Sequence, residues 1–207
     1  MTAPNALAEV SRRMERGILI LFTAAAGVIG IALLLPAARE LIQVLSGEAV
    51  ISLLTTADLA HTAADAGPSI VSATYDSARV VASDLSSGTA WMLGLGVAFS
   101  GLTIAVTAGA AVFFFLMLMW RRPFHLALVV ATQIAGSALL IGSLLSVGIG
   151  GLGRMQAASE LNPLANDVFI VGFAFDPAIM LVGLVVLSLS FVFARGLTLQ
   201  HDTKGLI

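Results

Sequence analysis

The sequence contains no cysteine, which excludes disulfide bonds and metal sites built from thiolates. Charged residues are also scarce, at 11% of 207 residues, too few to cover a soluble domain of this length. The net charge of -2 is too small to indicate direct binding to nucleic acid. No Ser-His-Asp order, H-E-x-x-H motif or P-loop is present. These absences argue against an enzyme, and no cofactor is indicated.

What the sequence has instead is hydrophobic residues, 58% of the chain, gathered in four stretches. Each stretch is long enough to cross a bilayer core of about 30 Å as a helix. A basic sequence, SRRMER, precedes the first stretch, but this stretch is longer than the apolar core of a cleaved signal peptide. We therefore predict an all-α integral membrane protein with four transmembrane helices and a mainly helical extracytoplasmic cap. The predicted spans are about 17–36, 91–120, 124–149 and 178–194.

The placement of Lys and Arg predicts the orientation, because cytoplasmic loops carry more of these residues than outer loops. Seven lie on one side of the predicted spans: Arg12, Arg13, Arg16, Arg121, Arg122, Arg195 and Lys204. Three lie on the other side: Arg39, Arg79 and Arg154. We therefore expect both termini and the RRPF loop in the cytoplasm, and the loops 37–90 and 150–177 outside.

Two tryptophans bracket the second predicted span. Trp91 and Trp120 are separated by a helix length of about 43 Å, near the thickness of a bilayer with its headgroups. Tryptophan rings prefer the membrane interfaces. We expect Trp91 to anchor the outer interface, and Trp120 the inner one together with Arg121 and Arg122.

The first outer loop is too long to be a simple connection. The first span is expected to continue past Pro36 and to stop at Gly47, a favourable helix end. A second helix is predicted between Thr55, with a capping-box spacing to Asp58, and Gly67-Pro68. A third is predicted from apolar residues at spacings of four and three, namely Val71, Tyr75, Ala78, Ala82 and Leu85.

Two segments have the composition of strands. AVISLL (49–54) and VFIVGFAF (168–175) are rich in β-branched and aromatic residues. A lone strand is only marginally stable, so we expect these two to form one short β pair outside the membrane. The alternative is that residues 168–175 begin the fourth helix, with Asp176-Pro177 as a kink.

Three weaker motifs have both a functional and a structural interpretation. GIGGLG (148–153) matches a dinucleotide motif by letter, but it follows a span rather than a strand, which favours a flexible helix exit. Asp58, His61 and Asp65 share a helical face that suits a cation, although such faces are more often simply solvated. His125 lies beside Arg121 and Arg122 at the mouth of the third span, where an interfacial polar anchor is a simpler role than a functional site.

No Asp, Glu, Lys, Arg or His lies in the middle of a predicted span, which argues against an ion-coupled transporter. Gln133 lies inside the third span, where an amide can form a hydrogen bond between helices. Small residues of the second span, Ala98, Gly101, Ala105 and Gly109, favour close helix packing in the same way. A homo-oligomer is compatible with these features.

The C-terminal sequence FVFARGLTLQHDTKGLI (191–207) resembles the signature of an uncharacterised bacterial membrane family, domain of unknown function 2975. In that signature an aromatic residue is followed by Gly, Leu and Asp at similar spacings and by a final Val or Ile. The final LI here departs from the more usual TV or TI. The resemblance implies four spans, a large first outer loop and a bacterial cytoplasmic (inner) membrane location.

Members of that family are often encoded beside a small Cro/CI-type helix-turn-helix regulator. The resemblance therefore implies a non-enzymatic sensor or anchor that sequesters such a regulator through its cytoplasmic tail, 195–207. The expected contact residues are Arg195, Leu199, Asp202, Lys204 and Ile207. The alternative is a structural or accessory subunit of a larger membrane complex, and a small-molecule carrier or pore has less support.

Overall fold

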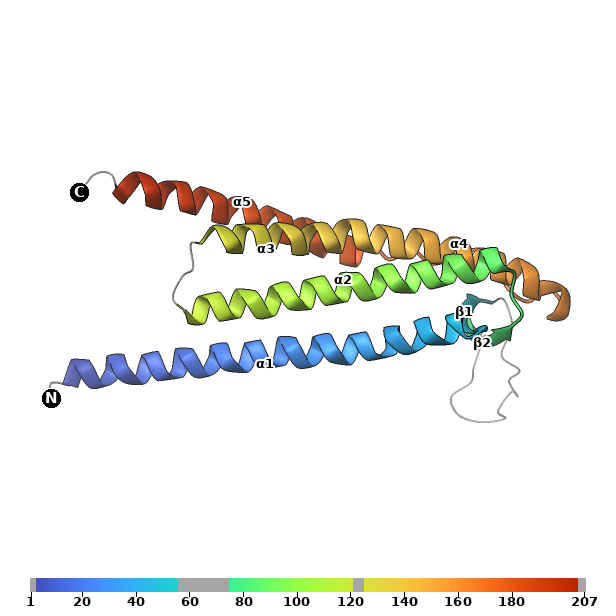
Figure 1. The fold of residues 1–207 in the computed structure, drawn as a ribbon, viewed down its shortest axis with the longest axis horizontal. Coiled ribbons are helices and arrows are strands. Elements are labelled where there is room, and N and C mark those ends of the chain that lie inside the picture. Colours follow the sequence, from blue (N-terminus) through green and yellow to red (C-terminus); the bar gives the residue numbers. More distant parts are fainter. Residues whose placement is uncertain (1–2, 56–74, 121–124, 205–207) are drawn as a thin grey trace, which may run out of the picture. The chain divides into compact units, whose positions relative to one another are not determined.

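The computed structural model describes residues 3–55, 75–120 and 125–204, and most of these lie in long helices. The helices are α1 (Ala3–Leu45), α2 (Ser87–Met119), α3 (Leu126–Ser137), α4 (Ser143–Leu161) and α5 (Ala178–Lys204). Five residues of π-helix, η1 (Ala138–Gly142), join α3 to α4. The third long helix therefore runs without a break from α3 to the end of α4 (Figure 1).

Among the described residues, four helices are long and apolar enough to cross a membrane. They are Met14–Leu45, Ser87–Met119, Leu126–Leu164 and Ala178–Thr198. Four such helices were predicted, and each predicted stretch overlaps one of them; their insertion in a membrane stays a prediction. Three of these helices exceed the roughly 20 residues that cross a bilayer core, so each of them has a part that extends beyond one membrane thickness.

The structure confirms that the first helix continues past its internal proline. Pro36 lies inside α1, which ends at Leu45. The backbone N–H of Ser46 donates to the Ile42 carbonyl at 2.9 Å, and Gly47 then adopts a φ of +89°. Glycine reaches this left-handed conformation without a steric penalty, which explains why the helix ends there.

Residues 150–161 of the predicted outer loop 150–177 are helical rather than irregular, because α4 continues to Leu161. GIGGLG lies inside this helix rather than at a flexible exit. Its glycines let α4 approach α2: a Cβ on Gly96 would lie 2.5 Å from the Cα of Gly150. The Ser146 hydroxyl donates to the Gly96 carbonyl at 2.9 Å across the same contact. Glycine here serves helix packing, so the dinucleotide interpretation has no structural basis.

The chain divides into two compact units. The first unit consists of Met1–Pro36, Ser100–Leu144 and Pro177–Ile207. The second unit consists of Ala37–Phe99 and Leu145–Asp176. The boundaries fall inside α1, inside α2 and just after η1, so three long helices contribute residues to both units.

In the first unit, α3 lies beside α5 (Figure 1). The contact depends on two glycines, because a Cβ on Gly136 would lie 2.8 Å from the backbone nitrogen of Leu187 and 3.1 Å from the Gly183 carbonyl oxygen. Helices α1 and α2 approach through Gly30 and Ala108 in a similar way. Close backbone approach at small residues is the usual means of packing helices that have no water to expel.

The small residues predicted for helix packing lie elsewhere. Ala98, Ala105 and Gly109 are exposed, Gly101 is half-buried, and no described atom lies within 4 Å of a Cβ built on Gly109. Their spacing correctly marks one face of α2, but spacing alone does not say which face meets a neighbouring helix. Packing between the described helices therefore uses other glycines, and contact of this face with another protein stays a prediction.

The second unit contains the predicted β pair, with a different partner. Strand β1 (Glu48–Leu54) pairs antiparallel with β2 (Ser77–Ser83), and Ile51 lies opposite Val80. The helix predicted through Ala78 and Ala82 is therefore wrong. A spacing of four fits an alternating strand as well as a helix, and the even-numbered side chains of β2 are the more buried ones.

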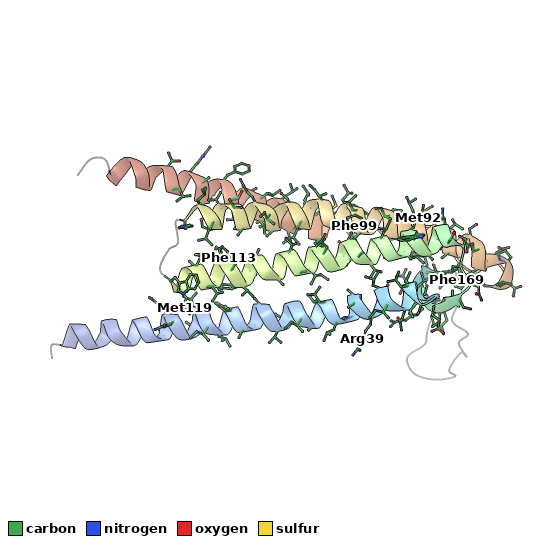
Figure 2. All side chains as sticks on the ribbon, in the orientation of Figure 1. Arg39, Met92, Phe99, Phe113, Met119 and Phe169 are labelled. Carbon is green, nitrogen blue, oxygen red and sulfur yellow. The ribbon has the colours of Figure 1, made fainter. Side chains whose placement is uncertain are left out.

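Residues 168–175 form neither a full strand nor the start of α5. Thr55 and Phe169 form one isolated bridge, and the Ile170 N–H donates to the Leu54 carbonyl at 2.9 Å. Phe169 lies beside the strands (Figure 2) and packs against a small core that includes Ile51 and Leu53. The pairing of 49–54 with 168–175 is therefore wrong for most of its length, because β1 pairs with β2 and only this bridge, just past the end of β1, contacts the second segment. The alternative of an early helix is wrong, because α5 begins only at Ala178.

Replacing Gly136 by alanine is expected to destabilise the first unit, because the methyl group meets backbone atoms that cannot move aside. Overpacking of this kind typically costs about 1–3 kcal/mol. Thermal unfolding of the detergent-solubilised chain should show a lower Tm for Gly136→Ala. Gly109→Ala is the matched control, since its Cβ meets open space. Equal melting temperatures for the two variants would contradict the proposed glycine contact.

Candidate functional site

The clearest polar cluster of the second unit lies where α2 begins. Ser86 precedes α2, and its hydroxyl oxygen accepts from the Thr89 N–H at 3.4 Å, as a helix-capping residue does. Glu160, in the last turn of α4, accepts from the Ser86 N–H at 3.0 Å and from the Ser86 hydroxyl at 2.6 Å. The carboxylate therefore completes the cap from a distant part of the chain.

Thr89 joins the same cluster from inside α2. Its side chain is fully buried, and its hydroxyl lies 2.6 Å from Glu160 Oε1 and 3.2 Å from the amide oxygen of Gln156. One hydroxyl has one proton, so it donates to the carboxylate. Turning the Gln156 amide by 180° lets its NH2 group donate to Thr89, which satisfies every member of the cluster.

These bonds lower the pKa of Glu160 from its ordinary value. The largest cause is the hydrogen bond from the Ser86 hydroxyl, followed by that from Thr89 and that from the Ser86 N–H, and desolvation opposes them weakly. Glu160 lies in the second unit, far beyond the roughly 20 residues of this helix that one bilayer core accommodates. The ionised carboxylate also faces the positive end of the α2 dipole.

The hydrogen bonds of this cluster hold two helix ends together, and they do not activate a nucleophile. Ser86 has no histidine or lysine beside it in these contacts, and a carboxylate that accepts three bonds is a weak base. Its effect is to tie the start of α2 to the end of α4. Glu160 was not among the predicted site residues, and only its distance of 71 residues from Thr89 explains why sequence patterns missed it.

A second feature of this unit is an apolar groove between the end of α1 and the start of α2. It encloses about 330 Å³, and Trp91, predicted as a membrane-interface anchor, lies in its wall with 67% of its surface exposed. No charged residue lines the groove. Its lining residues are Leu41, Val44, Leu45, Ser87, Ala90, Trp91, Gly94, Leu95 and Ala98. An apolar chain or ring is the chemistry that such a surface accepts.

The predicted contact residues of the C-terminal segment lie on a helix. Helix α5 continues to Lys204, and Arg195 is exposed. Arg195, Leu199 and Asp202 stand at spacings of four and three, so they share one helical face. The structure places Leu199, Asp202 and Lys204 in the helix by backbone only, and Ile207 lies outside the described residues.

The other predicted residues are distributed along the chain. His125 caps α3, with its Nδ1 accepting from the Ala127 N–H at 3.1 Å, in agreement with an anchoring role. Trp120 is exposed just after α2. Arg121 and Arg122 lie outside the described residues, as do Asp58, His61 and Asp65. Within the described ranges, no group of three His, Cys, Asp or Glu side chains suits a metal.

Comparison of the chain with protein families, with curated proteins and with solved structures finds no match in any of the three. The resemblance of residues 191–207 to the uncharacterised bacterial family therefore stays a prediction.

Replacing Glu160 by glutamine is expected to loosen the start of α2, since the charge that favours these hydrogen bonds is lost. Hydrogen exchange at the backbone amides of Ser86 and Thr89 should accelerate roughly two- to fivefold, the range for an exposed cap contact. A lowered pKa in the folded state contributes stability above the ordinary value of 4.5, and this is lost as pH falls through the folded value.

The difference between the native chain and Glu160→Gln should therefore be full at pH 7 and should shrink below pH 4.5. Glu40→Gln, an exposed glutamate of the same unit, is the control and should change nothing at these amides. A constant difference between pH 7 and pH 3 would show that the charge of Glu160 is not what stabilises the cap.

Proposed function

We propose that this chain is a non-enzymatic, multi-pass membrane sensor or anchor. The first unit crosses the bilayer, and the second unit lies outside the cytoplasm. The observation that carries the proposal is the division of long helices between two units, one with four helical segments that are apolar and uncharged, the other with its own small core. Helices α1 and α2 contribute residues to both units, and a continuous helix is a direct route for a signal.

The membrane placement is supported by the lengths of the apolar segments. Four segments of the first unit have no charged residue and are each close to the length that crosses a bilayer core: 17–36, 100–119, 126–144 and 178–194. In the second unit charges reappear at once, with Arg39 and Glu40 directly after the first segment. The excess of Lys and Arg beside the opposite ends supports cytoplasmic termini.

The second unit would perceive the stimulus. Its groove offers an apolar surface to a lipid or an apolar peptide, and both of its walls belong to helices that continue into the first unit. A ligand that binds one packing of α1 and α2 better than another would shift the population between them. Such a shift involves no chemical reaction. This agrees with the hydrogen bonds around Glu160, which link the start of α2 to the end of α4.

The output would be the cytoplasmic end of α5. A helical face of Arg195, Leu199 and Asp202 offers a cation, an apolar anchor and an anion to a partner. This arrangement supports the partner implied by the family resemblance, a small helix-turn-helix regulator that the tail holds or releases.

An accessory subunit of a larger membrane complex is the second candidate. The observation that favours it is that Ala105 and Gly109 of α2 are exposed, and that no described atom lies within 4 Å of a Cβ built on Gly109. A neighbouring helix from another integral protein could approach closely there.

The proposed topology predicts how single cysteines will react, because the chain has none of its own. Ser46→Cys, in the second unit, should be labelled by a membrane-impermeant maleimide in intact cells. Thr198→Cys should be labelled only after permeabilisation, and Ile29→Cys in neither case. Labelling of Thr198→Cys from outside would contradict the proposed orientation.

The proposed output is tested by affinity purification from native membranes, followed by mass spectrometry. The full chain should retain a small helix-turn-helix protein, and a version that ends at Arg195 should lose it. Leu199→Gln should weaken the same binding by about tenfold or more, as loss of an interface anchor does. Ser188→Ala, near the middle of the apolar part of the same helix, should leave this binding unchanged. Recovery of the same integral proteins with all versions would favour the accessory-subunit alternative.

A further inference from the structure

Gln133 is the most polar residue of the apolar segments. In 17–36, 100–119, 126–144 and 178–194 it is the only side chain that carries an amide or a charge. Its amide was expected to form a hydrogen bond between helices, which stays a prediction. The structure leaves it exposed on α3, while Ala135 and Gly136 are buried.

The depth of Gln133 follows from the pairing of α3 with α5. Gly136 touches Gly183 and Leu187, and the two helices run in opposite directions. Gln133 therefore lies level with about residue 188, the midpoint of the span Ala178–Thr198. With the membrane placement proposed above, on which this inference rests, the amide sits near the bilayer midplane.

Several hydroxyls of the first unit form hydrogen bonds within their own helices. The Thr132 hydroxyl donates to the Leu128 carbonyl at 2.8 Å. Ser143, Ser188 and Ser190 bond to carbonyls three or four residues earlier in the same way. The Gln133 amide makes no such bond to any described residue, although it has two donors and a strong acceptor. An amide without partners is unfavourable in hydrocarbon, where no water replaces them.

We propose that Gln133 pairs with Gln133 of a second copy of this chain across an α3–α3 interface. A two-fold axis along the bilayer normal brings the same residue of two parallel helices to the same depth. The amide is self-complementary, so each NH2 group donates to the other C=O. One polar residue in an apolar seam fixes register and partner number in this way.

The surroundings of Gln133 suit a helix interface. Leu126, Val130 and Ile134 are exposed, with 67%, 44% and 53% of their surfaces accessible. Together with Gln133 and Ser137 they lie within an arc of about 100° of α3. Gln133 lies at one edge of this arc and Ile134 at the other, so the face is apolar apart from the Gln133 amide and the Ser137 hydroxyl.

The test uses the full chain, reconstituted in phosphatidylcholine and phosphatidylglycerol vesicles, with one cysteine at Val130. Oxidation with copper phenanthroline should cross-link two copies of Val130→Cys. Adding Gln133→Leu should reduce the cross-linked fraction strongly, and Gln133→Asn should restore part of it. Ile29→Cys on α1, 58% exposed, is the control and should cross-link weakly whatever residue stands at 133.

Fluorescence energy transfer between labelled copies, measured as lipid is added, should show the dissociation constant rising about tenfold for Gln133→Leu. Because this side chain faces outward, the variant should keep its helix content. Unchanged association, or equal cross-linking at Val130 and Ile29, would overturn the pairing while leaving the membrane placement intact.

Two other outcomes would also overturn the pairing. Labelling of Gln133→Cys by a water-soluble maleimide would mean that the residue faces an aqueous path. Association of this face with another integral protein in place of a second copy would assign Gln133 to a different complex. Extraction of the native chain by alkaline carbonate would instead overturn the membrane placement itself, so the two failures are distinguishable.

Discussion

In the membrane placement proposed above, the first unit depends on one constraint, the need to satisfy polar groups without water. Helices meet it for the backbone, and hydroxyls such as those of Thr132 and Ser190 meet it by bonding to carbonyls of their own helix. Once these groups are satisfied, helices attract one another mainly through close contact. Glycines at Gly136 and Gly183 make that contact possible, because they let two backbones meet directly.

The second unit is stabilised by other kinds of contact, and its sequence contains more polar and charged residues than the apolar segments do. It has strands, capped helix ends and a carboxylate that binds across the chain, none of which the apolar segments contain. Glu160 fastens the start of α2, and Asn162 holds the Phe169 backbone with two hydrogen bonds of 2.9 and 3.0 Å. In this unit, polar bonds between distant segments thus act together with glycine contacts such as that of Gly96 with Gly150.

This difference explains what the sequence could predict. The length of the apolar stretches identified the four long apolar helices, because about 20 consecutive apolar residues are needed to cross a bilayer core. In the rest of the chain no such length requirement guides a prediction. Residues 150–161 were predicted as a loop because they are polar and glycine-rich, yet they form helix. Strand β2 was predicted as helix because Ala78 and Ala82 fit both periods, and only its pairing with β1 decides.

The candidate sites show the same limit at the level of single residues. Sequence identified Gln133 as unusual, but Thr132 and Gln133 are neighbours that point about 100° apart on one helix. One satisfies itself against Leu128 and the other faces away from the chain, a distinction that only packing makes. A polar residue in an apolar helix is therefore informative when no other group of the described chain forms a hydrogen bond with it. At Gln133 the chain leaves the amide unsatisfied, and a second copy provides the missing groups.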